Sequence, residues 1–468
     1  MPLKPSANQV PQPAPEVARG ALPGPERLAE GPSMQFSAAA SVVVVGAGII
    51  GLSLAFELAR RRVDVLVLER FRAGAGAAGM AAGMLAPTSE AEDENPDLVG
   101  LALESQRLYP RFVQAVQQAG ELDCGYRQDG TLLVALGRDD EDELARVRRM
   151  QERLGLSAKW MGPDEARALE PALSPRITGA LFASDDYQVD PRALLAALER
   201  AVEALGGRIV RNAWVTGFET RGDRLCRVIG QITPAGHDPT VRSRAGIPVA
   251  QAAGDRFFAV SCGAAVLAAG AWSSRDLIWP ATPLGVRPVK GQLVRLRGPQ
   301  LLRHVVRGLR AYLVPRHGGE LIVGATVEEQ GFDPLATAGA IMDLLWNARA
   351  IAPAVYDLEF AEVNVGFRPA TRDHLPIIGE TEVRGLYAGT GHFRHGVLLA
   401  PATAVLLADL IVDGRLDPVL IPFGPNRLSG TAAVGRNREH RATPAIADET
   451  GRRNGSAGRA EEPTGGRA

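Results

Sequence analysis

The sequence predicts an α/β fold, and three observations support this prediction. Residues Val42 to Val45 form a continuous β-branched run, which is typical of a strand buried on both faces of a parallel sheet. Glycines at the spacing G-x-G-x-x-G follow this run and open an apolar helix from about Ile50 to Arg61. A second apolar run, Val63 to Leu68, completes a strand, helix and strand of the kind that binds a dinucleotide.

Each glycine of this turn has its own physical task. Gly46 permits the tight turn, Gly48 lets the backbone approach a pyrophosphate, and Gly51 allows the helix to pack closely on the strand. Phosphates would then lie at the helix N-terminus, where free N–H groups and the helix dipole favour negative charge. Glu69 follows the second strand, where a carboxylate accepts hydrogen bonds from ribose hydroxyls. This carboxylate argues against a cofactor with a 2′-phosphate, which prefers arginine there.

The composition fits a globular chain of two domains. With 468 residues, 46% of them hydrophobic, the chain can bury a large core. A formal net charge of −1 excludes a strongly basic surface for nucleic acid or anionic membranes. No uninterrupted run of about 18 apolar residues predicts a membrane span. Cys124, Cys226 and Cys262 have no C-x-x-C spacing, which predicts a reducing, cytoplasmic compartment and neither a disulfide framework nor a metal site.

The two chain ends have low complexity, whereas the first half of the chain has periodic hydrophobic segments. Weakly hydrophobic, low-complexity ends predict disordered tails at 1–37 and 428–468. After the dinucleotide unit, periodic segments predict helices from Asp97 to Ala119 and from Asp140 to Leu154. Between them, alternating apolar residues predict a strand from Gly130 to Leu136 that enters a second domain.

The next segments return to the first domain. Asp190 and Pro191 supply an N-cap acid and a first-turn proline for a helix, and Arg208 to Val215 predicts the strand after it. The segment from Gly230 to Arg256 is polar and has no periodic pattern, which predicts an insertion at the surface. The apolar strand that follows ends in a glycine turn, A-A-G-A-W, from Ala268 to Trp272.

A second sheet is predicted from later alternating segments. Leu284 to Arg297, Ala311 to Arg316 and Glu320 to Thr326 have the turn glycines and alternation of antiparallel strands. Together with Gly130 to Leu136 they would form one sheet that covers the cofactor. The acidic run from Glu90 to Glu94 is interpreted as a solvated approach to a helix, because consecutive carboxylates point in different directions.

Two further motifs carry a resemblance to a known family. Arg72 to Pro87 consists almost entirely of small residues, which let backbone run close to a planar ligand, and it ends in A-A-G-M-L-A-P. Between Phe367 and Thr403 the chain reads F-R-P-A-T-R-D-H-L-P-I-I-G and then G-H-F-R-H-G-V-L-L-A-P-A-T. These motifs resemble the glycine oxidase branch of the D-amino-acid oxidase family of flavoproteins. Two departures are a missing hydroxyl at Ala77 to Gly79 and His395 in place of the usual asparagine.

The resemblance implies a glutathione-reductase-like, Rossmann-type FAD-binding domain with an inserted α+β substrate domain on an antiparallel or mixed sheet. We expect the FAD-binding domain to comprise 38–112, 181–280 and 366–424, and the substrate domain 113–180 and 281–365. The FAD would be bound noncovalently, because the three cysteines fall outside the flavin motifs near the C-terminal end.

The site residues combine local chemistry with the resemblance. Arg368 offers a planar fork of donors suited to a substrate carboxylate, and the proline after it keeps its backbone extended. The resemblance implies that Tyr312 and Arg394 are further catalytic residues and that Met84 and His392 line the substrate pocket. The predicted cofactor-binding residues are Gly46, Gly48, Ile50, Gly51, Glu69, Arg70, Ala82, Gly83, Met84, Val215, Ala269, Gly270, Trp272, Gly391, His392, Phe393, Arg394, His395, Gly396, Val397 and Leu398.

The resemblance implies oxidation of glycine, and of sarcosine or small D-amino acids, by FAD and O₂. The products would be an imine, then glyoxylate and ammonia, with H₂O₂, and the pathway would be thiamine thiazole synthesis. A D-amino-acid dehydrogenase or a sarcosine-type oxidase is the nearest alternative, and a noncatalytic flavin-binding subunit of a complex is the alternative from another class. The expected partners are the small amino acid, O₂ and further copies of the chain, without nucleic acid or membrane.

Overall fold

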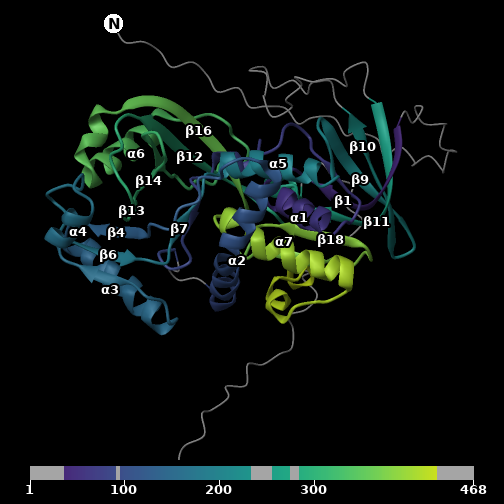
Figure 1. Ribbon diagram of the computed structural model, residues 1–468, viewed down its shortest axis with the longest axis horizontal. Helices are drawn as coiled ribbons and strands as arrows, with labels where there is room; N and C mark the ends of the chain where they lie inside the picture. The colour runs from purple at the N-terminus through teal and green to yellow at the C-terminus, as the bar shows by residue number, and fades with distance from the viewer. Residues whose placement is uncertain (1–35, 91–94, 233–255, 275–283, 429–468) are drawn as a thin grey trace, which may run out of the picture. The chain divides into compact units, whose positions relative to one another are not determined.

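The computed structural model describes residues 36–90, 95–232, 256–274 and 284–428, which all belong to one compact unit (Figure 1). The predicted tails lie outside these residues, except that Phe36 and Ser37 begin the first strand and Leu428 ends the last short helix. Most of the predicted insertion, 233–255, also lies outside them.

The first sheet contains the predicted dinucleotide unit at its centre. In spatial order its strands are β17 (Ile377–Glu380), β18 (Leu386–Thr390), β11 (Arg256–Leu267), β1 (Phe36–Val45), β2 (Val65–Leu68) and β8 (Arg208–Val210). β18, β11, β1, β2 and β8 run parallel to one another, and β17 is antiparallel to β18. An antiparallel hairpin of β9 (Ala213–Arg221) and β10 (Arg224–Ile232) pairs with β11.

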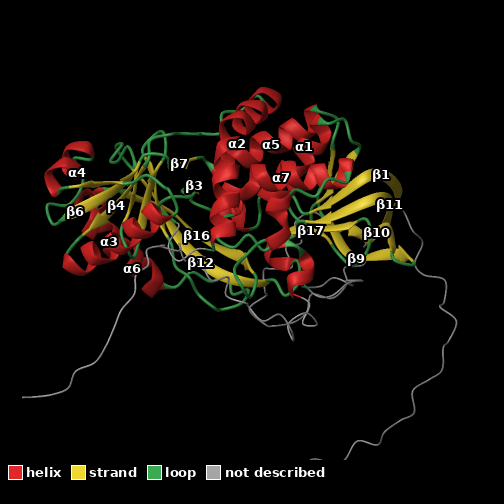
Figure 2. Ribbon diagram, turned by 90° about the horizontal axis from the view of Figure 1, so that it is seen from below, coloured by secondary structure: helices red, strands yellow, loops and turns green. Residues whose placement is uncertain are grey.

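Alternation along β1 explains why this sheet is buried on both faces. Val42 and Val44 pack into a core with four helices, whereas Val43 and Val45 pack into the core on the other face. The helices are α1 (Ile49–Arg60), α2 (Pro96–Gly120), α5 (Pro191–Ala204) and α7 (Gly396–Asp413), which lie together in Figure 2.

The second sheet is mixed, and its strands come from two separate parts of the chain. In spatial order they are β16 (Glu359–Ala370), β12 (Arg287–Arg297), β15 (Glu320–Gly324), β14 (Tyr312–Pro315), β13 (Val305–Arg307), β4 (Thr131–Ala135), β6 (Gly179–Ala183) and β5 (Lys159–Met161). All neighbours are antiparallel except β13 and β4. The helices α3 (Arg138–Arg153), α4 (Pro163–Leu169) and α6 (Ala338–Ile351) accompany this sheet, and a short ribbon of β3 (Met84–Leu85) and β7 (Tyr187–Gln188) lies apart from it.

The α/β fold with a second, mixed sheet is confirmed, and the differences from the prediction are local. The strand predicted over Arg208 to Val215 is two strands, because Asn212 between them has a left-handed φ of 61°. Helix α6 was not predicted, since only Leu344, Ala348 and Ile351 of it are buried. The domain boundaries stay a prediction, although β16 continues across the one placed between 365 and 366.

Helix α7 is the one described helix that is long and apolar enough to cross a membrane. In this structure 67% of that 18-residue stretch is buried, and the helix packs against α1 and α2. Its hydropathy is therefore that of a core helix.

A proline inside α7 is compensated by α2. Pro401 has no N–H, so the Val397 carbonyl loses its usual partner one turn later in the helix. The hydroxyl of Tyr109, which is fully buried, donates to that carbonyl at 2.8 Å. On the same side, Ser105 Oγ donates to the Leu398 carbonyl at 2.6 Å. Two side chains of α2 thus hold the first turns of α7 in place.

Replacing Tyr109 with phenylalanine is expected to lower the free energy of unfolding by about 1–3 kcal/mol, because a buried carbonyl loses its donor. Thermal and urea denaturation of the purified variant would measure this change. Tyr356→Phe is the matched control, since Tyr356 is 73% exposed. Equal stability of the two variants would show that the hydrogen bond contributes nothing.

Candidate active site

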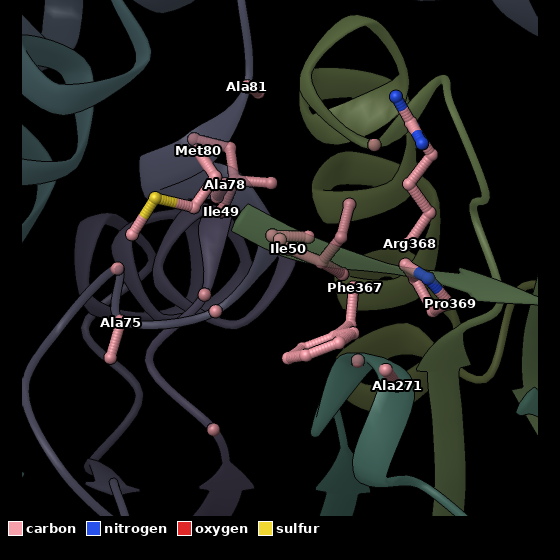
Figure 3. Close-up of a pocket in the computed structure, with 18 of the residues that line it drawn as sticks. Ile49, Ile50, Ala75, Ala78, Met80, Ala81, Ala271, Phe367, Arg368 and Pro369 are labelled. Atoms are coloured by element: carbon pink, nitrogen blue, oxygen red, sulfur yellow. The ribbon is translucent and has the colours of Figure 1, made fainter. Parts of the chain in front are cut away.

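One large cavity of about 710 Å³ is lined by segments that are far apart in the sequence. Its wall includes the turn between β1 and α1, the small-residue segment after β2, and the glycine turn after β11. Strands β12, β14 and β16 of the second sheet and the start of α7 complete the wall. In Figure 3, Phe367 and Arg368 project from β16 on one side, and Ile50 and Met80 lie on the other. A cavity of this size falls within the range of ligand-binding pockets.

The glycine turn has the geometry that a pyrophosphate requires. Gly46 has a φ of +107°, which an L side chain rarely adopts. A Cβ built on Gly51 would lie 1.9 Å from the Gly46 carbonyl oxygen, so this glycine allows the helix to close on the turn. A Cβ on Gly48 would meet no atom within 4 Å, and Gly48 faces the cavity. The open space beside the N-terminus of α1 therefore fits the diphosphate of FAD.

Glu69 lies at the end of β2 on the cavity wall, as the ribose interpretation requires. Its Oε2 accepts a hydrogen bond from the Ala47 N–H at 2.7 Å, and its Oε1 accepts one from the Phe71 N–H at 2.8 Å. Burial raises the pKa of this carboxyl, and the backbone donors of Ala47, Phe71 and Arg70 oppose that shift. The carboxylate is fixed in orientation, and each oxygen keeps a lone pair for a ribose hydroxyl.

The N-terminus of α7 faces another part of the cavity. Gly396 and Val397 line it, and the N-cap residue His395 makes no side-chain cap. The first N–H groups of a helix have no partner within the helix, and its dipole places positive potential there. This end of α7 is therefore suited to negative charge on a bound group, such as that of a reduced flavin.

Arg368 is a partly buried cation on the cavity wall. Its Nη1 donates to the Thr326 carbonyl at 2.9 Å and weakly to the Lys290 carbonyl at 3.4 Å. Burial lowers the pKa of Arg368, and nearby Tyr312 and Glu90 partly offset this effect. Among the described residues, its Nη2 and Nε have no hydrogen-bond acceptor, which leaves donors of the fork for a carboxylate.

The other predicted substrate-side residues surround this arginine. Tyr312 lines the cavity, and burial raises the pKa of its phenol while Arg368 lowers it. Met84 and the exposed Arg394 also line the wall. Burial, assisted by the charge of His395, lowers the pKa of His392 to about 3. His392 Nε2 lies 3.1 Å from the Thr403 hydroxyl, so it is a neutral, structural hydrogen-bonding group.

Most of the predicted residues meet at this one cavity. Those on its wall are Arg368, Tyr312, Arg394, Met84, His392, Gly46, Gly48, Ile50, Glu69, Arg70, Ala82, Gly83, Val215, Ala269, Gly270, Trp272, Phe393, Gly396 and Val397. Four others are not on the wall: Gly51, Gly391, His395 and Leu398. Gly51 and Gly391 allow close backbone packing, His395 precedes α7, and Leu398 belongs to the core behind it. None of the three cysteines, all of which are described, lines the cavity, which supports noncovalent binding.

Several wall residues were missed because their signal is not local. The solvated interpretation of the acidic run is wrong for Glu90, whose side chain lines the cavity and is only 12% exposed. The rest of that run, 91–94, lies outside the described residues. Phe367 and Trp272 line the cavity, and Phe332 packs against both, with ring centroids 5.2–6.2 Å apart among the three rings. Only the pairing of strands brings such residues together.

Gly291 on β12 leaves the space that the guanidinium of Arg368 occupies. It pairs with Gly366 on β16, and a Cβ built on it would lie 2.3 Å from Nη1 of Arg368. We therefore expect Gly291→Ala to displace the guanidinium and raise the KM for an amino-acid substrate about tenfold or more, with flavin content unchanged. Steady-state kinetics and the visible spectrum test this. Gly263→Ala, at an exposed position of β11, is the control, and equal KM values for both variants would show that Gly291 does not position Arg368.

Comparisons with known proteins agree with this geometry. A glycine oxidase from Geobacillus kaustophilus is 34% identical over 397 residues, which cover 84% of this chain and 98% of that protein. Its crystal structure matches with a TM-score of 0.73 and 31% identity, over 83% of this chain and 99% of that one.

A bifunctional protein ThiO/ThiG from Trichormus variabilis is 35% identical over 84% of this chain, which spans only 56% of that longer relative. Residues 41–410 match the family described as FAD dependent oxidoreductase, a range that includes both the glycine turn and Arg368. The chain therefore belongs to this family of FAD dependent oxidoreductases, the D-amino-acid oxidase family.

Proposed function

We propose that this protein oxidises glycine with noncovalently bound FAD and O₂, giving an imine that water converts to glyoxylate and ammonia, with H₂O₂. The observation that carries the proposal is the partly buried Arg368, which shares one cavity with the glycine turn of a dinucleotide site. A planar cation at this position suits a small carboxylate substrate. The relatives named glycine oxidase, which match nearly their whole length, support glycine as that substrate.

Different residues of the cavity would hold the cofactor and the substrate. Gly46 and Gly48 would receive the diphosphate, and Glu69 the adenosine ribose. The N-terminus of α7 would stabilise negative charge at the ring end. When bound, FAD supplies the two-electron oxidant. The task of the chain is then to place the substrate and to exclude water.

On the substrate side, Arg368 would bind the carboxylate, with Tyr312 beside it and Met84 and Arg394 on the surrounding wall. A carboxylate fixed in this way limits where the α-carbon lies. Burial lowers the pKa of His392 to about 3 and its Nε2 lies 3.1 Å from the Thr403 hydroxyl, so this imidazole is too weak a base to take the proton of the substrate amine. The substrate amine must therefore lose its proton before the α-carbon is oxidised.

The fusion of a similar chain in the protein named ThiO/ThiG supports a role in thiamine thiazole synthesis. We also propose a cytoplasmic location, self-association of the chain, and the FAD-binding and substrate domains with the boundaries given above.

Purified protein tests the proposal directly. The expected sample is yellow, loses its visible absorption when glycine is added anaerobically, and produces H₂O₂ in air. A panel of glycine, sarcosine and D-alanine, compared by kcat/KM, would rank the substrates. A yellow protein that is inert to all three would refute the oxidase and favour the noncatalytic subunit.

A further inference from the structure

Glu90 is an acidic side chain on the same cavity wall as Arg368 and Arg394, and it is distinct from Glu69 at the ribose position. It follows the short strand β3, and its N–H donates to the Ala86 carbonyl at 3.1 Å. The side chain lines the cavity with 12% of its area exposed. Burying an isolated carboxylate is costly, so a partly buried one facing a ligand cavity calls for a positive partner.

The turn that carries Glu90 is fixed by the second half of the fold. Asp186, which is fully buried, accepts hydrogen bonds at 3.1 Å from the Thr88 and Ser89 N–H groups. Gln151 of α3 donates to the Thr88 carbonyl at 2.8 Å, and Arg307 of β13 donates to the Ser89 carbonyl. Glu90 is thereby held at a set position on the wall.

The charges of Glu90 and Arg368 are complementary to those of an amino-acid zwitterion. Ser89, next to Glu90 in the chain, accepts a hydrogen bond from Arg307, and Arg307 pairs with Tyr312 across β13 and β14. Glu90 therefore lies at the Tyr312 end of the cavity, where its charge acts on both Tyr312 and Arg368. Among the described residues, its ion-pair contact is with His395 Nδ1 at 3.9 Å, which is too long for a hydrogen bond. The carboxylate is therefore available to a cationic group of the substrate.

We propose that Glu90 is a specificity-determining residue that binds the ammonium group of the substrate in the initial complex, before the amine loses its proton, while Arg368 binds the carboxylate. This inference rests on the proposed function, because it assigns the second charged group of the same small amino acid. The pair of opposite charges selects zwitterions and disfavours 2-hydroxy acids, which have the carboxylate but no cation.

Replacement of Glu90 by glutamine tests the assignment, because the two ligand classes respond with opposite sign. The apparent Kd for glycine, measured by anaerobic stopped-flow reduction of the flavin, should rise at least about tenfold through loss of a charge-assisted bond. The Kd for glycolate, measured by perturbation of the flavin spectrum, should stay equal or fall, since an anion no longer meets the Glu90 carboxylate. Glu90→Asp should retain part of the preference for glycine.

Glu359→Gln is the matched control, since Glu359 is exposed and does not line the cavity. Equal weakening of glycine and glycolate in Glu90→Gln would overturn the assignment, because it would indicate general damage to the wall. Unchanged binding of both ligands would overturn it as well. If the unmodified protein binds both ligands but glycine does not reduce the flavin, the oxidase proposal fails, and glycine affinity read from the spectral perturbation still tests Glu90.

Discussion

Replacing Arg368 with alanine should raise the KM for glycine by about 10²–10³-fold, the largest kinetic effect expected from a single side chain here. The substrate carboxylate would lose a bidentate, charge-assisted partner and remain in a partly dehydrated cavity, which costs about 3–4 kcal/mol. Because the hydrogen bonds that Arg368 makes with described residues go to the backbone carbonyls of Thr326 and Lys290, its loss should leave the fold intact. Steady-state kinetics, with flavin content and thermal denaturation in parallel, would measure the effect.

Two further variants sharpen this test. Arg368→Lys keeps the charge and loses the planar fork, so its KM should fall between those of the unmodified protein and the alanine variant. Arg372→Ala removes an exposed arginine from the same segment, outside the cavity wall, and should be kinetically silent. If the KM of Arg368→Ala equals that of Arg372→Ala, the carboxylate is bound elsewhere.

The parts of the fold that could be predicted are those whose signal is local. The valine run, the glycine spacing and the acid at Glu69 all lie within one strand, helix and strand, so their neighbours in space are also neighbours in sequence. Arg368 was predicted because its residue type suits a carboxylate and because the segment around it resembles a known family. Periodicity alone would not distinguish it from a surface arginine.

The rest of the site depends on contacts that only the folded chain makes. In the sequence, Glu90 looks like one of several solvated acids. In the structure, Asp186, almost a hundred residues away, holds the turn at Thr88 that places Glu90 on the cavity wall. Gly291 and Gly324 look like ordinary strand glycines. In the structure they leave room for the side chains of Arg368 and Tyr312, because a Cβ on either would lie within 2.5 Å of them. Whether a glycine faces such a side chain depends on strand register, which the sequence pattern does not specify here.

The space beside Gly48 leads to the second large effect, because a side chain there would compete with the cofactor and with nothing else. A Cβ on Gly48 meets no protein atom within 4 Å, whereas one on Gly51 would collide with the Gly46 carbonyl. Gly51→Ala would therefore damage the turn itself, and Gly48→Val should fold normally. The valine would occupy the diphosphate position, so we expect flavin content to fall at least about tenfold.

The ratio of visible to ultraviolet absorbance of purified Gly48→Val, with and without added FAD, measures this loss. Gly100→Val is the control, since Gly100 on α2 is exposed and also has no atom near its Cβ position. Circular dichroism of both variants should match that of the unmodified protein. Normal flavin content in Gly48→Val would place the diphosphate away from the N-terminus of α1. A folded but colourless variant would tie cofactor binding to this one backbone position, independently of any substrate.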